Sequence, residues 1–176
     1  MLAIVAFTVG IGSATAIFTV INGVMLRPLP YRDGDRFVAL YTADTSEPGR
    51  YGSVSVPDLI AYQQGSTSFD VFGWFRLVNF NLTVSGDPQY VSGAAVTPSL
   101  AQNLGVNPVL GQWFTGQGGA VISNGLWRRL GADPNIVGRS LRLDDRPFTV
   151  TGVMPPAFRP PAAGLVGGGN QPEVWI

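Results

Sequence analysis

The sequence has 176 residues, enough for one domain of ordinary size and a membrane segment. Its 11 basic residues, all arginine, balance 11 acidic residues, so no basic surplus supports a nucleic-acid partner. Histidine and cysteine are absent, which excludes disulfides, zinc sites built from these residues, and catalysis by a histidine base or a cysteine nucleophile.

The first 26 residues, Met1 to Leu26, carry no charge. As a helix they would extend about 39 Å, which exceeds the roughly 30 Å thickness of a bilayer's hydrocarbon core. We therefore predict a transmembrane helix over residues 1–26. A cleaved signal peptide is the alternative, because Ala14-Thr15-Ala16 fits a small-residue cleavage site. Against it, no positive charge precedes the apolar run, and the run continues past that site.

Small or polar residues recur along this stretch at alternating steps of four and three: Thr8, Gly12, Thr15, Thr19 and Asn22. Residues with that spacing share one face of a helix, and in lipid such residues mark where helices pack closely. We expect this face to pack against other transmembrane helices.

Residues 27–36 follow as a Pro-rich exit from the membrane, stiffened by Pro28 and Pro30. Arg27, Arg32 and Arg36 lie here, and the positive-inside rule taken alone would place the following domain in the cytoplasm. The sequence begins inside an apolar run, so the rule has only one flank of the helix to compare and orientation does not follow from charge alone.

Residues 37–176 mix short strands with short helices and predict an α+β domain with a mostly antiparallel or mixed sheet. Val174 to Ile176 is the start of a further strand, and we expect the domain to continue beyond it. The predicted strands are Phe37 to Thr42, Phe80 to Val84, Tyr90 to Val96, Ala120 to Ser123, Ser140 to Leu143 and Phe148 to Val153, the last two joined as a hairpin around Asp144-Asp145-Arg146. The predicted helices are Pro57 to Gln64, Pro98 to Leu104, and one that begins at Ser123 or Asn124 and ends before Gly131, while Gly164 to Asn170 is predicted as a loop.

No catalytic, cofactor-binding or metal-binding residue is predicted, and no cofactor is implied. The sequence lacks a phosphate-binding loop motif. Asp144 and Asp145 fit a turn better than an acid–base pair, and Ser123 fits a helix cap because it has no histidine partner. The four tryptophans are interpreted as core or interface anchors rather than a ligand cage: Trp74, Trp113, Trp127 and Trp175.

Several short motifs occur in one order along nearly the whole chain. They are Gly10 to Phe18, Val20 to Asn22, Leu26 to Tyr31, Val56 to Leu59, Phe80 to Thr83, Gly105 to Pro108, Ile122 to Arg129, Asp133 to Arg139 and Val150 to Phe158. In this order they resemble the opening of MacB/FtsX-type ABC transporter permeases, and in particular the duplicated MacB-like permeases of acidobacterial type.

The resemblance implies a transmembrane helix followed by a MacB-like periplasmic core domain over residues 37–176. It implies further transmembrane helices or a second permease copy, and a separate ABC ATPase that supplies energy. The chain would then be a non-catalytic permease segment in the bacterial inner membrane, with its main domain in the periplasm. A stand-alone membrane-anchored binding or adhesion module is the alternative function.

Overall fold

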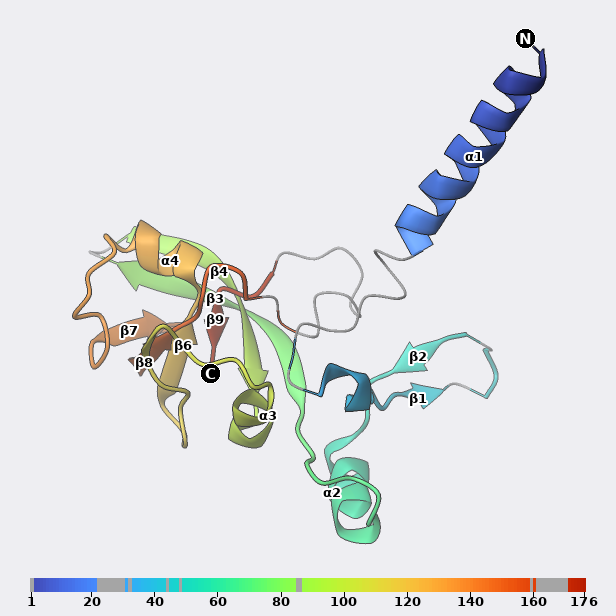
Figure 1. Ribbon diagram of the computed structural model, residues 1–176. Helices are drawn as coiled ribbons and strands as arrows, with labels where there is room; N and C mark the ends of the chain where they lie inside the picture. Colours follow the sequence, from blue (N-terminus) through green and yellow to red (C-terminus); the bar gives the residue numbers. More distant parts are fainter. Residues whose placement is uncertain are drawn as a thin grey trace. The chain divides into compact units, whose positions relative to one another are not determined.

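The computed structural model describes residues 2–21, 31, 33–43, 45–47, 49–84, 87–158, 160 and 171–176. The chain divides into two compact units, residues 1–37 and residues 38–176. Figure 1 shows the elements in chain order. The helices are α1 Leu2–Ile21, η2 Gly34–Arg36 (a 3₁₀ turn), α2 Val56–Gly65, α3 Pro98–Asn103 and α4 Asn124–Arg129. The strands are β1 Thr42–Ala43, β2 Tyr51–Gly52, β3 Phe75–Val84, β4 Asp87–Val96, β5 Leu110–Gly111, β6 Gly119–Ile122, β7 Ser140–Leu143, β8 Arg146–Val153 and β9 Val174–Trp175.

The first unit contains α1, which has no charged residue. Among the residues that the structure describes, no helix combines the length and the apolar character needed to cross a bilayer. The structure has a helix over Leu2–Ile21, whereas the predicted membrane-spanning role of this region stays a prediction. Asn22 to Pro30 of the predicted span and exit lie outside the described residues. In the part of the exit that is described, η2 forms and the ring of Tyr31 meets Phe37 edge-on, with centroids 6.1 Å apart.

The second unit is built on a closed sheet. Six strands run in the order β8-β6-β9-β4-β3-β7, and β7 pairs again with β8 to complete the ring. β5 pairs with the end of β8, at Gly152 and Val153. The β4–β9 and β6–β8 pairs are parallel and the others in the ring are antiparallel. This confirms the expected α+β class and the mixed sheet, while the closure of the sheet was not foreseen.

The ring closes through a short contact. β3 and β4 pair along ten residues each, but β3 meets β7 only at Leu82 and Thr83. Asp144 extends this contact into the turn that follows β7: its backbone N–H donates to the carbonyl of Asn81 at 3.0 Å. The Asp144 carboxylate also accepts from the Asn81 backbone N–H at 2.8 Å and from its side-chain amide at 3.2 Å. The β7–β8 turn therefore holds the two ends of the sheet together.

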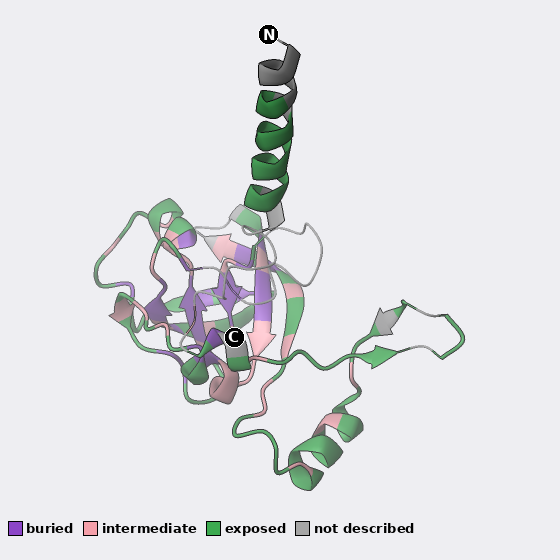
Figure 2. Cartoon of the chain, turned by 45° about the vertical axis from the view of Figure 1, so that its right-hand side comes forward, coloured by how far each residue is buried: buried purple, intermediate pink, exposed green. Residues whose placement is uncertain are grey.

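Apolar side chains from every strand of the ring fill its interior, and Figure 2 shows where buried residues lie on these strands. Burial of one such Leu, Ile or Val side chain contributes about 1.5–3 kcal/mol. The core residues are Phe80, Leu82, Val91, Ala120, Ile122, Leu126, Ile136, Leu141, Leu143, Val150, Val153 and Val174.

Local signals in the sequence explain most of the element boundaries. The Ser55 hydroxyl accepts from the Asp58 N–H to begin α2, and Ser123 does the same for Leu126 at the start of α4. Gly131, with φ of 93°, ends α4. The predicted strand at Phe37 to Thr42 is wrong for all but its last residue, since β1 covers only Thr42–Ala43. Its β-forming side chains find no neighbouring strand among the described residues. The predicted loop at Gly164 to Asn170 lies outside the described residues.

Candidate functional site

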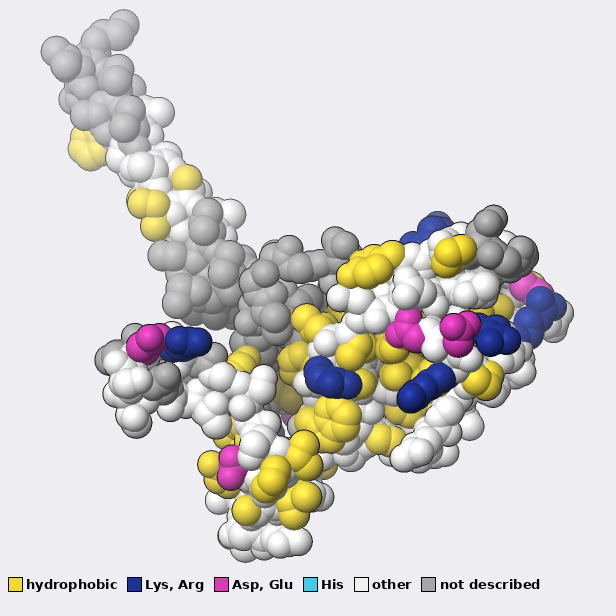
Figure 3. Space-filling model, turned by 180° about the vertical axis from the view of Figure 1, so that it is seen from behind, with side chains coloured by type: hydrophobic (Ala, Val, Ile, Leu, Met, Phe, Trp, Pro, Cys, Tyr) yellow, Lys and Arg dark blue, Asp and Glu magenta, His cyan; other side chains and the backbone are white. Residues whose placement is uncertain are grey.

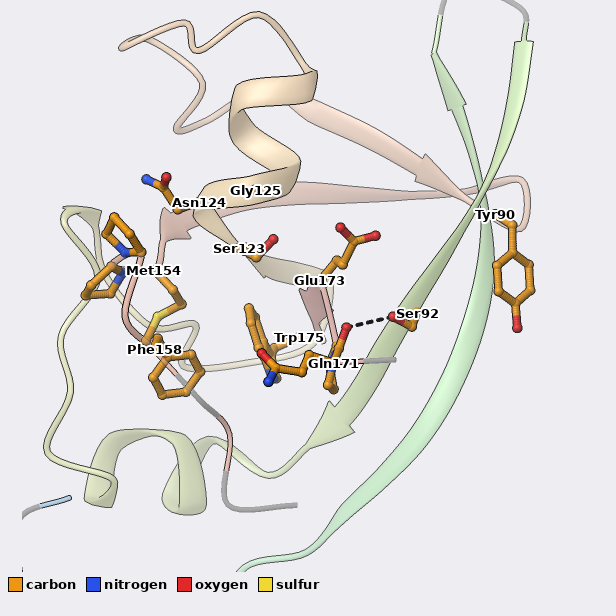
Figure 4. Close-up of a pocket in the computed structure, with 13 residues that line it drawn as sticks. Tyr90, Ser92, Ser123, Asn124, Gly125, Met154, Phe158, Gln171, Glu173 and Trp175 are labelled. Carbon is orange, nitrogen blue, oxygen red and sulfur yellow. Dashed lines mark hydrogen bonds between the residues drawn. The ribbon is translucent and has the colours of Figure 1, made fainter. Parts of the chain in front are cut away.

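A cavity of about 500 Å³ opens beside the start of α4, next to β9 and the segment that follows β8 (Figure 4). Its lining comes from parts of the chain that are far apart in sequence and meet only in the closed sheet. The lining residues are Tyr90, Ser92, Ser123, Asn124, Gly125, Met154, Pro155, Pro156, Phe158, Gln171, Pro172, Glu173 and Trp175. Tyr90 is 67% exposed, and Figure 4 shows its ring pointing away from the other labelled side chains.

One wall of the cavity is aromatic. The rings of Phe158 and Trp175 meet edge-on with centroids 5.3 Å apart, and Met154 lies beside them, fully buried. Behind them Trp113 meets Phe158 at 6.1 Å and Trp175 at 6.4 Å. The Trp113 indole N–H donates to the carbonyl of Val106 at 2.8 Å. Edge-on stacking and this hydrogen bond fix the rings in place, so the wall is part of the domain's framework.

The polar groups of the lining are largely occupied by contacts within the chain. The Ser92 hydroxyl donates to the carbonyl of Gln171 at 2.8 Å. Both Glu173 oxygens accept from the Arg129 guanidinium, one of them at 2.9 Å, and this hydrogen bonding raises the pKa of Arg129. Within the described residues no buried side-chain nitrogen or oxygen lacks a hydrogen-bond partner. The cavity thus combines an apolar wall with a polar rim in which Ser92 and Glu173 are engaged by contacts within the chain.

The residues predicted for helix packing lie on α1. Thr8, Gly12, Thr15 and Thr19 are all exposed in this chain, and Asn22 lies outside the described residues. The Thr19 hydroxyl donates to the carbonyl of Thr15 at 2.7 Å, which satisfies that hydroxyl within the helix. Their packing against other helices stays a prediction.

The four tryptophans have different surroundings. Trp113 and Trp175 are buried in one aromatic cluster, and the half-buried Trp127 donates its indole N–H to the carbonyl of Asp133 at 2.9 Å. These three are anchors, as expected. Trp74 differs, because it is 44% exposed.

Two features of the second unit were missed by reasoning from the sequence. The cavity was missed because its lining residues are distant in sequence and none of the motifs that contain them is a ligand-binding motif. The role of Asp144 was missed in part: the turn was predicted, but the contact of its carboxylate with Asn81 was not. Both the cavity and the Asp144–Asn81 contact join residues that are distant in sequence, so neither leaves a signal within a short stretch of the chain.

The chain is similar to solved domains of transporter and permease proteins. The extracellular domain of the noncanonical ABC-type transporter YknZ from Gram-positive bacteria matches with a TM-score of 0.53 and 12% identity, over 74% of this chain and 64% of that one. The periplasmic region of MacB from Actinobacillus actinomycetemcomitans matches with a TM-score of 0.48 and 13% identity, over 67% and 61%. A domain assigned to a permease from Porphyromonas gingivalis matches with a TM-score of 0.49 and 17% identity, over 66% and 49%.

The chain spans between about half and two thirds of the length of these structures. A search of curated protein sequences found no match. The model of the MacB-like periplasmic core domain family, whose members are domains of ABC transporter permeases, matches residues 1–176. The chain therefore belongs to the family of MacB-like periplasmic core domains.

Proposed function

We propose that this chain is the opening segment of an ABC-type permease, a non-catalytic part of an export or mechanotransmission system. Residues 1–26 cross the inner membrane, residues 27–36 form the exit, and residues 37–176 stand in the periplasm. There the domain couples a partner ABC ATPase to a substrate or partner protein outside the membrane. The observation that carries this proposal is the family match, which extends over the membrane-proximal residues as well as the folded domain.

The construction of the second unit supports a mechanical role. Its sheet is closed and its core side chains are buried, with Leu82, Ile122 and Leu126 fully so. A closed, densely packed sheet deforms little, so a push delivered through a stiff exit moves the domain as a body instead of being absorbed within it. Prolines at positions 28 and 30 restrict the backbone of that exit.

The small-residue face of α1 supports contact with further transmembrane helices or with a second permease copy. A side chain added at Gly12 would meet nothing within 4 Å in this chain, and the same holds at Gly10. The two positions are two residues apart and so lie on opposite faces of the helix. Gly12→Leu should therefore reduce copurification of the ATPase and the other permease helices in mild detergent, whereas Gly10→Leu should leave it near the wild-type level. Equal effects of the two changes would contradict the assignment of this face.

A topology assay tests the proposed function directly. A reporter active only outside the cytoplasm and a reporter active only inside are fused in turn after Ile176. We expect activity of the outside reporter in the membrane fraction. Activity in soluble periplasmic extract would mean that the first helix is a cleaved signal, and activity of the inside reporter alone would place the domain in the cytoplasm. Either of these two results refutes the proposal.

A further inference from the structure

The junctions between neighbouring strands of the ring differ in length. β3 and β4 pair along ten residues each, whereas the β7–β8 and β6–β8 junctions each have four residue pairs. The β3–β7 junction has only two residue pairs, and the contact between Asn81 and Asp144 extends it. We call this junction the seam, and it consists of Asn81, Leu82, Thr83, Arg142, Leu143 and Asp144.

The junctions of β9 are as short as the seam, with two residue pairs to β4 and two to β6, but they are covered. Trp175 of β9 is 4% exposed, and its ring packs edge-on against Phe158, as Figure 4 shows. Just before β9, the Glu173 N–H donates to the Ser92 carbonyl at 2.7 Å, and the Glu173 carbonyl accepts from the Ser123 N–H at 2.8 Å. Separating β9 from either neighbour would disturb this packing, so its junctions are better secured than the seam.

The outer face of the seam is open to water. The Arg142 side chain is 61% exposed and lies 3.6 Å from the Asp145 carboxylate, whose side chain is 90% exposed. Asn81 and Asp144 are exposed as well. Figure 3 shows arginine and acidic side chains next to one another on the surface of the second unit. Backbone groups in such a place can exchange a partner in the chain for water, which lowers the free energy of a local opening.

The inner face of the seam is apolar. Leu82 and Leu143 are Cα partners across it, and they are 0% and 1% exposed. When the seam parts, β3 stays paired with β4 and β7 stays paired with β8, so both hairpins keep their own contacts and only their ends separate. The return of the two leucines to the core then draws the seam closed again.

We propose that the ring opens reversibly at the seam before any other part of the second unit unfolds, so that the β3–β4 hairpin moves relative to the other strands. A load too small to open the seam moves the domain as a body, and a larger load parts β3 from β7 first. The inference goes beyond the proposed function and does not depend on it, because it follows from pairing and exposure within the second unit.

Hydrogen exchange resolved to single residues tests the proposal in the whole chain. Successive N–H groups of an antiparallel strand face opposite neighbours. The N–H of Asn81 donates across the seam, so that of Thr83 faces β7 too, whereas those of Phe80 and Leu82 face β4. After correction for the rates of an unstructured chain, we expect Asn81 and Thr83 to exchange at least about tenfold faster than Phe80 and Leu82. Equal rates would overturn the proposal, because the seam would then open only together with the hairpin.

A disulfide across the seam gives a second readout, since the chain has no cysteine of its own. Thr83→Cys with Arg142→Cys puts cysteines at two Cα partners, whose separation suits a disulfide. Oxidation should slow the exchange of Asn81 at least about tenfold. The matched control, Ser140→Cys with Thr149→Cys, joins Cα partners of β7 and β8 and should leave the exchange of Asn81 unchanged. The proposal is wrong if Asn81 still exchanges fast in the oxidised seam variant, or if the control slows it equally.

Discussion

Asp144→Ala should loosen the contact that closes the ring of strands. The change removes the carboxylate that accepts from both the backbone and the side-chain N–H groups of Asn81. It also puts alanine at a φ of 47°, in the left-handed region that aspartate and asparagine tolerate better. β3 and β7 share only two paired residues each, so little else holds this junction.

We expect Asp144→Ala to lower the free energy of unfolding by about 2 kcal/mol. A hydrogen bond to a charged acceptor contributes up to about 3 kcal/mol, but both residues are exposed and water replaces part of the loss, which leaves about 1 kcal/mol. The left-handed alanine adds about 1 kcal/mol. For a domain of this size, a loss of 2 kcal/mol lowers the melting temperature by about 4–8 °C.

Two further variants separate the cost of the lost hydrogen bonds from the cost of the left-handed backbone conformation. Asp145→Ala, at φ of 63°, carries the backbone cost alone, because its carboxylate is 90% exposed and lies 3.6 Å from Arg142. Asp144→Asn keeps an acceptor oxygen and the left-handed tolerance and should cost least. Denaturation in detergent, followed by tryptophan fluorescence, should rank the losses as Asp144→Ala, then Asp145→Ala, then Asp144→Asn. If Asp144→Ala and Asp145→Ala cost the same, the carboxylate does not help to close the ring.

Three other changes test the packing, the ion pair and the exit. Gly93→Ala should destabilise the domain by about 1–3 kcal/mol, because an added Cβ would lie 2.5 Å from the Phe80 ring. Gly65→Ala should not destabilise it, because an added Cβ there would meet nothing within 4 Å. Chemical denaturation measures the free energy of unfolding of both variants. Glu173→Gln should cost less than about 1 kcal/mol, and the difference from wild type should shrink in high salt, because the side chains of Arg129 and Glu173 are 48% and 25% exposed. Burial raises the pKa of Tyr31 from 10.0 to about 12, because it penalises the phenolate. The stability that this group contributes is therefore full below pH 10 and is lost as the pH rises to 12. Denaturation across this range should show a smaller decline of the free energy of unfolding in Tyr31→Phe than in the wild type.

Elements defined by neighbouring residues could be predicted from the sequence. Ser55 and Ser123 cap α2 and α4 through contacts three residues away, and Asp144-Asp145 makes a two-residue turn. These signals lie within a few residues of the structure they specify. The family could also be inferred, because its short motifs keep their order along the chain, and the family match confirms it.

What could not be predicted depends on pairings between distant residues. Phe37 to Thr42 has the composition of a strand, but a strand forms only where a neighbour is available, and composition does not reveal the neighbour. The closure of β7 on β3 joins residues about sixty positions apart, and the cavity joins Ser92 to Gln171 across a longer separation. Each depends on the assembled sheet.

The place of β9 has a consequence for the order of assembly during synthesis. Val174 and Trp175 lie between β4 and β6, parallel to the first and antiparallel to the second. Until these residues leave the ribosome, β4 and β6 have no common neighbour and the ring stays open. The β3–β4 hairpin and the β7–β8 hairpin can form early, because their contacts are local. The edges of β4 and β6 that pair with β9 then stay open until β9 is synthesised, and open strand edges in a nascent chain are sites of aggregation.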